Sequence, residues 1–189
     1  MRISPRQRAR AVTGMLAVAA CALLLTGCAQ PDPVVAPHAT STAKPLFASD
    51  AEALAAATKA YAAYLKMSDL ISQEGGIKPE RMKPLVTNKM LAHETSSASK
   101  LAASGQRQRG RTAFDHTSLQ SVIQRDKGAI VDMYVCLDLS GVQIIDDAGD
   151  DATAPGARTR YSFVASFVAK PDKSVLLDSN VPWDGASFC

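Results

Sequence analysis

Residues 129–139 read AIVDMYVCLDL, and this stretch decides the fold of the domain that contains it. Every second position is apolar, so one face carries Ala129, Val131, Met133, Val135, Leu137 and Leu139. The other face is more polar and carries Asp132, Tyr134, Cys136 and Asp138. Because successive side chains of a strand point to opposite sides, the pattern predicts a β-strand with one apolar face.

Three further segments share this two-residue period and predict three more strands. Their apolar positions are Phe114, Leu119, Val122 and Ile123 in residues 112–124, Tyr161, Phe163, Ala165 and Phe167 in residues 160–169, and Val175, Leu177, Val181 and Trp183 in residues 174–183. The apolar positions of residues 112–124 change phase, which predicts a β-bulge. Residues 146–158 contain two glycines and a proline and are expected to form a loop.

The segment before these strands has the period of helices. Ser49 and Glu52 have the spacing of a capping box, and apolar residues follow at intervals of three and four until Gly75-Gly76 ends the predicted helix. A short turn is expected at residues 79–82, and a second helix from about Thr87 to Ala103. Helices followed by strands predict an α+β domain over residues 49–189, with N-terminal helices packed on a mainly antiparallel sheet of about four strands.

The composition is that of a globular protein, with 47% apolar and 21% charged residues, which excludes a disordered chain and a polytopic membrane protein. Residues 1–27 differ from the rest of the chain in composition. Four arginines, at positions 2, 6, 8 and 10, precede 15 uncharged and mostly apolar residues from Ala11 to Leu25. A positive start, a short apolar run and small residues are typical of a secretory signal peptide, and the run is short for a membrane span.

The end of this segment, Leu25-Thr26-Gly27-Cys28, resembles a bacterial lipobox. The resemblance implies that signal peptidase recognises Leu25, Thr26 and Gly27 and that Cys28 becomes the acylated first residue. Two acyl chains anchor a protein stably where one does not. We therefore expect a lipid anchor on the extracytoplasmic face of the cell membrane. Residues 28–48, which contain four prolines, are expected to be a tether.

Without residues 1–27 the chain keeps 17 basic and 18 acidic residues, so it has no basic field that would attract nucleic acid. Two cysteines then remain besides Cys28, namely Cys136 and Cys189. An even pair in an exported chain predicts a disulfide between them. The alternative is a buried thiol and a free terminal thiol.

The order of elements is similar to that of the cystatin-like or nuclear-transport-factor-2-like cone. The chain also resembles uncharacterised lipoproteins of actinobacterial type, in high-GC Gram-positive bacteria, that carry such a domain. The likeness rests on residues 61–65, Gly75-Gly76, residues 112–115, 118–120 and 134–140, Trp183-Asp184-Gly185 and Phe188-Cys189. It implies a curved sheet around a long helix. The broad superfamily contains enzymes, binding proteins and assembly factors, so the fold does not choose among them.

The candidates for chemistry are few. Asp115 and His116 could act as an acid–base pair, but neighbours on a strand face opposite sides, which argues against a shared pocket. His93-Glu94 lacks the second histidine of a zinc motif, and the acidic residues 146–151 lack the spacing of a calcium loop. No catalytic residue, metal site or cofactor is therefore predicted. Three alternating arginines, at positions 107, 109 and 111, are expected to protect an edge strand or to meet anionic groups.

Five aromatic side chains are expected to fill the core or to line a cavity between helix and sheet: Tyr61, Tyr64, Phe163, Phe167 and Trp183. The leading hypothesis is a non-catalytic binding or accessory module of the cell envelope, whose partners are membrane lipid, through Cys28, and an envelope protein or polymer. The alternative is a small pocket enzyme of isomerase or dehydratase type on the same fold. A filled interior would favour the first, and titratable groups in a sealed apolar pocket would favour the second.

Overall fold

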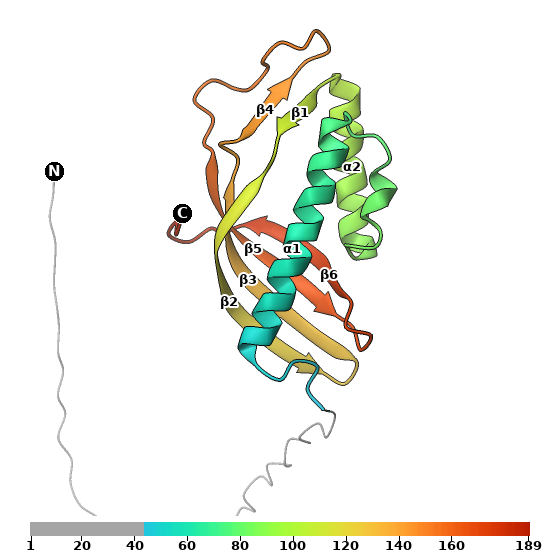
Figure 1. The fold of residues 1–189 in the computed structure, drawn as a ribbon, viewed down its shortest axis with the longest axis vertical. Helices are drawn as coiled ribbons and strands as arrows, with labels where there is room; N and C mark the ends of the chain where they lie inside the picture. The colour runs from blue at the N-terminus through green and yellow to red at the C-terminus, as the bar shows by residue number, and fades with distance from the viewer. Residues whose placement is uncertain (1–43) are drawn as a thin grey trace, which may run out of the picture. The chain divides into compact units, whose positions relative to one another are not determined.

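The computed structural model describes residues 44–189, which form an α+β domain (Figure 1). Its helical elements are α1 (Asp50–Gln73), the single-turn η1 (Pro79–Met82) and α2 (Asn88–Ser104). Its strands are β1 (Arg107–Gly110), β2 (Ala113–Arg125), β3 (Gly128–Asp138), β4 (Val142–Ile145), β5 (Arg160–Ala169) and β6 (Val175–Pro182). The predicted signal peptide, the lipobox with Cys28 and most of the tether lie outside the described residues.

Helix α1 begins and ends where the sequence predicts. The Ser49 hydroxyl accepts a hydrogen bond from the Glu52 amide at 3.2 Å, and the Glu52 carboxylate accepts one from the Ala48 amide at 2.7 Å. This capping box satisfies amides that have no partner within the helix. At the other end the Gly76 amide donates to the Ile71 carbonyl at 2.8 Å. Phe47, in the last part of the predicted tether, already packs against the core.

Four strands form an antiparallel sheet in the order β2-β3-β5-β6, which confirms the coarse fold prediction. The stretch AIVDMYVCLDL lies in or next to the central strand β3. Val131, Met133 and Val135 are fully buried, as their shared face predicts. Helices α1 and α2 lie on this face of the sheet (Figure 1), so the apolar faces of helix and sheet bury one another.

Aromatic rings fill the space between α1 and the sheet. Tyr61 is fully buried and packs edge-on against Phe114 and Phe167, with ring centroids 5.2 and 6.4 Å away. Tyr64 and Phe167 are also buried, and Phe163 packs against the same core. Of the two roles expected for these aromatics, the structure therefore assigns core filling to four of the five.

Trp183 is the exception, and its predicted face is wrong. The register of β6 against β5 shifts between the pairs Phe167–Leu177 and Ser166–Ser179. The extra residue, Asp178, reverses the alternation, so that side chains after it point to the opposite side of the sheet. Val181 consequently lies on the outer face and is 50% exposed, and Trp183 follows it there.

A second, two-stranded sheet pairs β1 with β4 and was not predicted. Each strand has only four residues, and β1 reads RQRG, which carries no apolar period. Arg107 and Arg109 lie in β1, whereas Arg111 follows it. The junction of β1 and β2 is held by Asp69 of α1, a buried carboxylate that accepts hydrogen bonds from the Thr112 amide and hydroxyl and from the Gln108 amide group.

No helix within residues 44–189 is both long and apolar enough to cross a membrane.

Candidate functional site

The face of the main sheet that points away from the helices carries rows of side chains across all four strands. One row is apolar and consists of Ile123, Ile130, Val168 and Leu176, which are paired in register. The next row is polar and consists of Ser121, Asp132, Ser166 and Ser179. A third row consists of Ser118, Tyr134, Val164 and Val181. Ile123 is 47% exposed, so the apolar rows of this outer face remain accessible to solvent.

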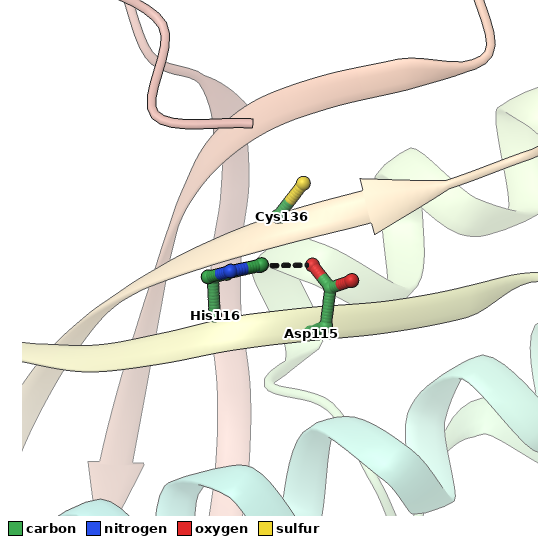
Figure 2. Close-up of side chains that lie close together, drawn as sticks. All are labelled: Asp115, His116 and Cys136. Atoms are coloured by element: carbon green, nitrogen blue, oxygen red, sulfur yellow. Dashed lines mark hydrogen bonds and ion pairs between the residues drawn. The ribbon is translucent and has the colours of Figure 1, made fainter.

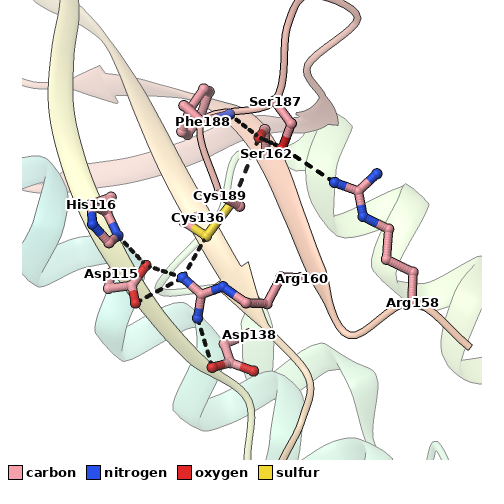
Figure 3. The surroundings of a disulfide bond; sticks show 10 residues. All are labelled: Asp115, His116, Cys136, Asp138, Arg158, Arg160, Ser162, Ser187, Phe188 and Cys189. Carbon is pink, nitrogen blue, oxygen red and sulfur yellow. Dashed lines mark hydrogen bonds and ion pairs between the residues drawn. A yellow bond between two sulfur atoms is a disulfide. The ribbon is translucent and has the colours of Figure 1, made fainter.

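The C-terminal segment, residues 183–189, folds back over one part of the outer face. The Trp183 amide donates to the Ser162 carbonyl at 2.8 Å, and the Phe188 amide donates to the Ser162 hydroxyl at 3.1 Å. Cys136 of β3 and Cys189 form a disulfide with their Cα atoms 5.5 Å apart (Figure 3). The structure thus brings together the two cysteines that the sequence pairs, and the bond fixes the end of the chain on the sheet.

The side chains of this segment build a groove with the sheet beneath them. Tyr134 packs edge-on against Trp183 and Phe188, with centroid distances of 5.2 and 5.6 Å. Together with His116, Thr117 and Ser118 of β2, these rings line a hollow of about 430 Å³. We refer to these six residues as the outer-face groove. Its volume lies within the range of small-ligand sites, and its lining combines apolar rings with hydroxyls and an imidazole.

Asp115 and His116 meet, contrary to the expectation from strand alternation. His116 lies in the β2 bulge, where the register shifts between Asp115 and Ser118, and has a φ of +48°. This backbone conformation brings its ring to the side of Asp115. The His116 Nδ1 atom lies 2.7 Å from Asp115 Oδ1 in a hydrogen bond (Figure 2). Both side chains are exposed, so the pair sits at the rim of the groove.

Arg160 of β5 connects this pair to the disulfide. Its guanidinium donates to both Asp115 oxygens at 2.8 and 2.9 Å, to Asp138 at 2.8 Å and to the Cys136 sulfur at 2.9 Å (Figure 3). The hydrogen bond with His116 and then that from Arg160 hold the pKa of Asp115 below its usual range. Asp115 is therefore ionised at neutral pH, which makes it a poor general acid.

Asp115, His116 and Cys136 each offer one metal-ligating atom, and these atoms lie within 4.8 Å of one another. Two of the three donors are already engaged. Cys136 is oxidised in the disulfide, and Asp115 takes the guanidinium of Arg160 on both oxygens. A cation placed here would also lie beside that positive charge. These residues are therefore better suited to a hydrogen-bonded polar network beside the groove than to a metal centre.

Tyr64 and Glu94 form a second pair of titratable side chains, between helices α1 and α2. The Tyr64 hydroxyl donates to Glu94 of α2 at 3.0 Å, beside a hollow of about 130 Å³ that α1, η1 and α2 enclose. That volume is well below the range of ligand sites. Burial, with a smaller contribution from Glu94, raises the pKa of Tyr64 far above its ordinary value, so the hydroxyl stays protonated. The arrangement links the two helices.

The sequence predicts neither the groove nor the role of Arg160. Two signals point towards the groove in retrospect. Tyr134 is a large aromatic residue on the more polar face of its strand, and Trp183 and Phe188 both lie within a few residues of Cys189. Because the disulfide joins that end of the chain to β3, their rings are carried to Tyr134.

The fold is similar to that of the intermembrane-space region of the chloroplast protein ARC6, with a TM-score of 0.51. The two chains share 15% sequence identity over 70% of this chain and 97% of that one. The structural similarity supports a shared fold, and at this low sequence identity it indicates nothing about activity. No protein-family model matches the chain, and no curated protein matches its sequence.

Proposed function

We propose that the protein is a membrane-anchored extracytoplasmic lipoprotein whose folded domain is a non-catalytic binding or accessory module of the cell envelope. The observation that carries this proposal is the outer-face groove. Aromatic rings and hydroxyls are presented to solvent on a sheet face that no helix of the described residues covers. Exposed aromatic and apolar groups in a hollow are the usual composition of a recognition site for a partner or small molecule.

The largely filled interior supports a binding role. A pocket enzyme on this fold would hold titratable groups in a sealed cavity between helix and sheet. Tyr61, Phe167 and Met133 have no exposed surface and fill the middle of that space. A hollow of about 270 Å³ remains beside the C-terminal half of α1, but the buried carboxylate that lines it, Asp69, is engaged in hydrogen bonds from Gln108 and Thr112. Asp115 and His116 lie instead on the opposite side of the sheet, in contact with solvent. The lipid anchor rests on the lipobox-like residues 25–28, and the finer assignment to the cystatin-like or nuclear-transport-factor-2-like cone rests on the long helix α1 lying across an antiparallel sheet.

The hydrogen bond between His116 and Asp115 favours the second candidate, a small pocket enzyme. A carboxylate on Nδ1 orients the imidazole and would leave Nε2 to act on a ligand in the groove. The open rim is the argument against it, because water has free access to the pair. Retained ligand binding with lost turnover in His116→Ala would favour the enzyme, and unchanged behaviour would favour the binding module.

Photo-crosslinking in intact cells tests the binding role. A crosslinking amino acid at Ser118, on the groove, should capture a stoichiometric envelope component. The same amino acid at Lys59, an exposed position on α1, should not. Addition of Trp183→Ala should weaken capture at Ser118, because it removes one wall of the groove. Equal capture at both positions, or none at either, would contradict the proposal.

Replacement of Cys28 tests the anchor. We expect Cys28→Ala to release the protein from the membrane fraction, because the lipobox position then lacks the thiol that carries the lipid. Fractionation of cells that express the variant, followed by mass spectrometry of its N-terminus, measures this. Cys189→Ala is the matched control and should stay with the membrane. An unchanged distribution of Cys28→Ala would refute the lipid anchor.

A further inference from the structure

The two sulfurs of the Cys136–Cys189 disulfide differ in accessibility. Cys136 lies in the central strand with no exposed surface, whereas Cys189 is an exposed residue at the end of the chain. The Cys189 sulfur accepts a hydrogen bond from the Ser162 hydroxyl at 3.4 Å, but Cys189 is the only one of the two cysteines with exposed surface, so we infer that a nucleophile from solvent attacks the Cys189 sulfur. In thiol–disulfide exchange the attacked sulfur determines which cysteine departs, so Cys136 is the leaving group.

The leaving sulfur has a cation beside it. Arg160 Nη2 donates to Cys136 Sγ at 2.9 Å and also to Asp115, while Nη1 donates to Asp138. A positive, hydrogen-bonding group stabilises a thiolate relative to a thiol, and a stabilised thiolate departs faster. Figure 3 shows the guanidinium of Arg160 beside the Cys136 sulfur, on the side of the bond that would depart.

We propose that this disulfide is an exchange-active site that takes dithiol reductants and opens the outer-face groove. A thiolate of the reductant attacks Cys189 Sγ, a new sulfur–sulfur bond forms there, and the bond to Cys136 breaks with its electron pair on Cys136 Sγ. The second thiolate of the reductant then displaces Cys189. The protein disulfide gains two electrons and, from water, two protons, while the dithiol is oxidised to its own disulfide.

Reduction of the disulfide affects the groove because two of the six groove residues belong to the C-terminal segment that reduction releases. Phe188 directly precedes Cys189, and Trp183 lies six residues before it. Besides the disulfide, the segment is held by hydrogen bonds to Ser162, by one from Arg158 to the Ser187 hydroxyl at 3.2 Å, and by the packing of the two rings on Tyr134. The oxidised protein presents a formed groove, and the reduced protein loses it. This regulatory consequence rests on the proposed function, whereas the exchange chemistry does not.

The direction of attack is tested with the wild-type protein and glutathione, a monothiol whose first attack leaves a mixed disulfide that can be trapped before a second glutathione displaces it. Acid quenching, alkylation and peptide mapping identify the cysteine that carries glutathione. We expect it on Cys189, with Cys136 free and alkylated. Glutathione on Cys136 would overturn the proposal, and so would a disulfide that resists exchange under conditions that reduce an exposed reference disulfide.

The role of Arg160 is tested by the rate of reduction with dithiothreitol. We expect Arg160→Gln to slow reduction roughly threefold to tenfold, because the Cys136 thiolate loses its cation. Arg160→Lys should keep most of the rate. Arg158→Gln is the matched control, since Arg158 contacts the same segment without touching sulfur. A rate in Arg160→Gln equal to or above that of the wild type would overturn the assigned role.

The effect on the groove is read from Trp183, the single tryptophan of the chain. Reduction should shift its emission to longer wavelength and increase quenching by acrylamide, while the far-ultraviolet circular dichroism of the domain stays unchanged. The Cys136→Ala/Cys189→Ala variant should show the reduced spectrum without reductant. Unchanged emission on reduction would overturn the gating, and would leave the binding role to be judged by crosslinking at Ser118.

Discussion

His116 shows how the backbone conformation of one residue redirects a side chain. Its positive φ is uncommon for a residue other than glycine, although histidine is among the residues that adopt it more often. In a regular strand its ring would point away from Asp115. In the bulge the ring contacts the Asp115 carboxylate, which Arg160 also holds. Three residues from two strands thereby form a polar network that reaches the groove at His116.

The two buried tyrosines predict alkaline instability. Burial raises the pKa of Tyr61 and Tyr64, so both stay protonated in the folded protein while unfolded tyrosines ionise near pH 10. Their contribution to stability is complete below about pH 10 and falls above it by about 1.4 kcal/mol per pH unit for each tyrosine. We expect Tyr64→Phe to remove about half of the pH dependence that the two tyrosines produce together.

Urea unfolding between pH 9 and pH 12 measures that slope. Tyr64→Phe should also lose about 1 kcal/mol at pH 7, since the hydrogen bond to Glu94 is removed. Tyr161→Phe, at a half-buried position on β5, is the control. Identical pH slopes for the wild type and Tyr64→Phe would show that the buried hydroxyl does not govern alkaline unfolding.

At the scale of elements, Asp178 joins helix α2 to the sheet. It is the extra residue of the β6 bulge, and its carboxylate accepts hydrogen bonds from Thr87, the N-cap of α2, at 2.7 Å and from Lys89 at 2.8 Å. The hydrogen bond from Lys89, together with that from Thr87, lowers the pKa of Asp178. One carboxylate in the β6 bulge therefore ties the first turn of α2 to the sheet.

The contact between α1 and α2 depends on Gly76. A Cβ atom there would lie 2.2 Å from the Ala98 carbonyl oxygen, and the residue has a φ of +83°. We expect Gly76→Ala to destabilise the domain by more than about 2 kcal/mol, through both clash and backbone strain. Gly149→Ala, at a φ of +89° with no neighbouring atom within 4 Å, isolates the strain and should cost about 1 kcal/mol.

Thermal or urea unfolding of both glycine variants measures the difference. Equal losses would mean that the close approach of α1 and α2 adds nothing to the strain. A Gly76→Ala variant as stable as the wild type would mean that neither the contact nor the conformation is required.

At the scale of the molecule, the disulfide closes a loop across 53 residues that includes β4, β5 and β6. Restricting an unfolded chain over that length stabilises the folded state by about 4 kcal/mol. We expect Cys136→Ala/Cys189→Ala to lose about this amount in urea unfolding at pH 7. Wild-type protein treated with a reductant should lose a similar amount. A loss below about 1 kcal/mol in both would show that the bond serves the C-terminal segment alone.

Most helices and strands could be predicted from local sequence patterns, because residues that are close in the chain determine where these elements form. Ser49 and Thr87 cap helices through neighbouring amides, and alternate apolar residues make β3 a strand. The pairing of β1 with β4 could not be predicted, since RQRG and VQII are too short to show alternating apolar and polar residues and come together only when the chain folds. The face of Trp183 was predicted wrongly, because the bulge at Asp178 exists only in the register between β5 and β6.

The sequence alone therefore determined the α+β class, the helix boundaries, the buried face of β3 and the pairing of Cys136 with Cys189, and it predicts the lipid anchor at Cys28. Each of these depends on residues that are close in the chain or on the count and compartment of the cysteines. Only the tertiary structure decided that Tyr134, Trp183 and Phe188 form a groove and that Arg160 lies against a buried sulfur. Those contacts join residues from separate strands, and strand register and one backbone bulge determine which side chains meet.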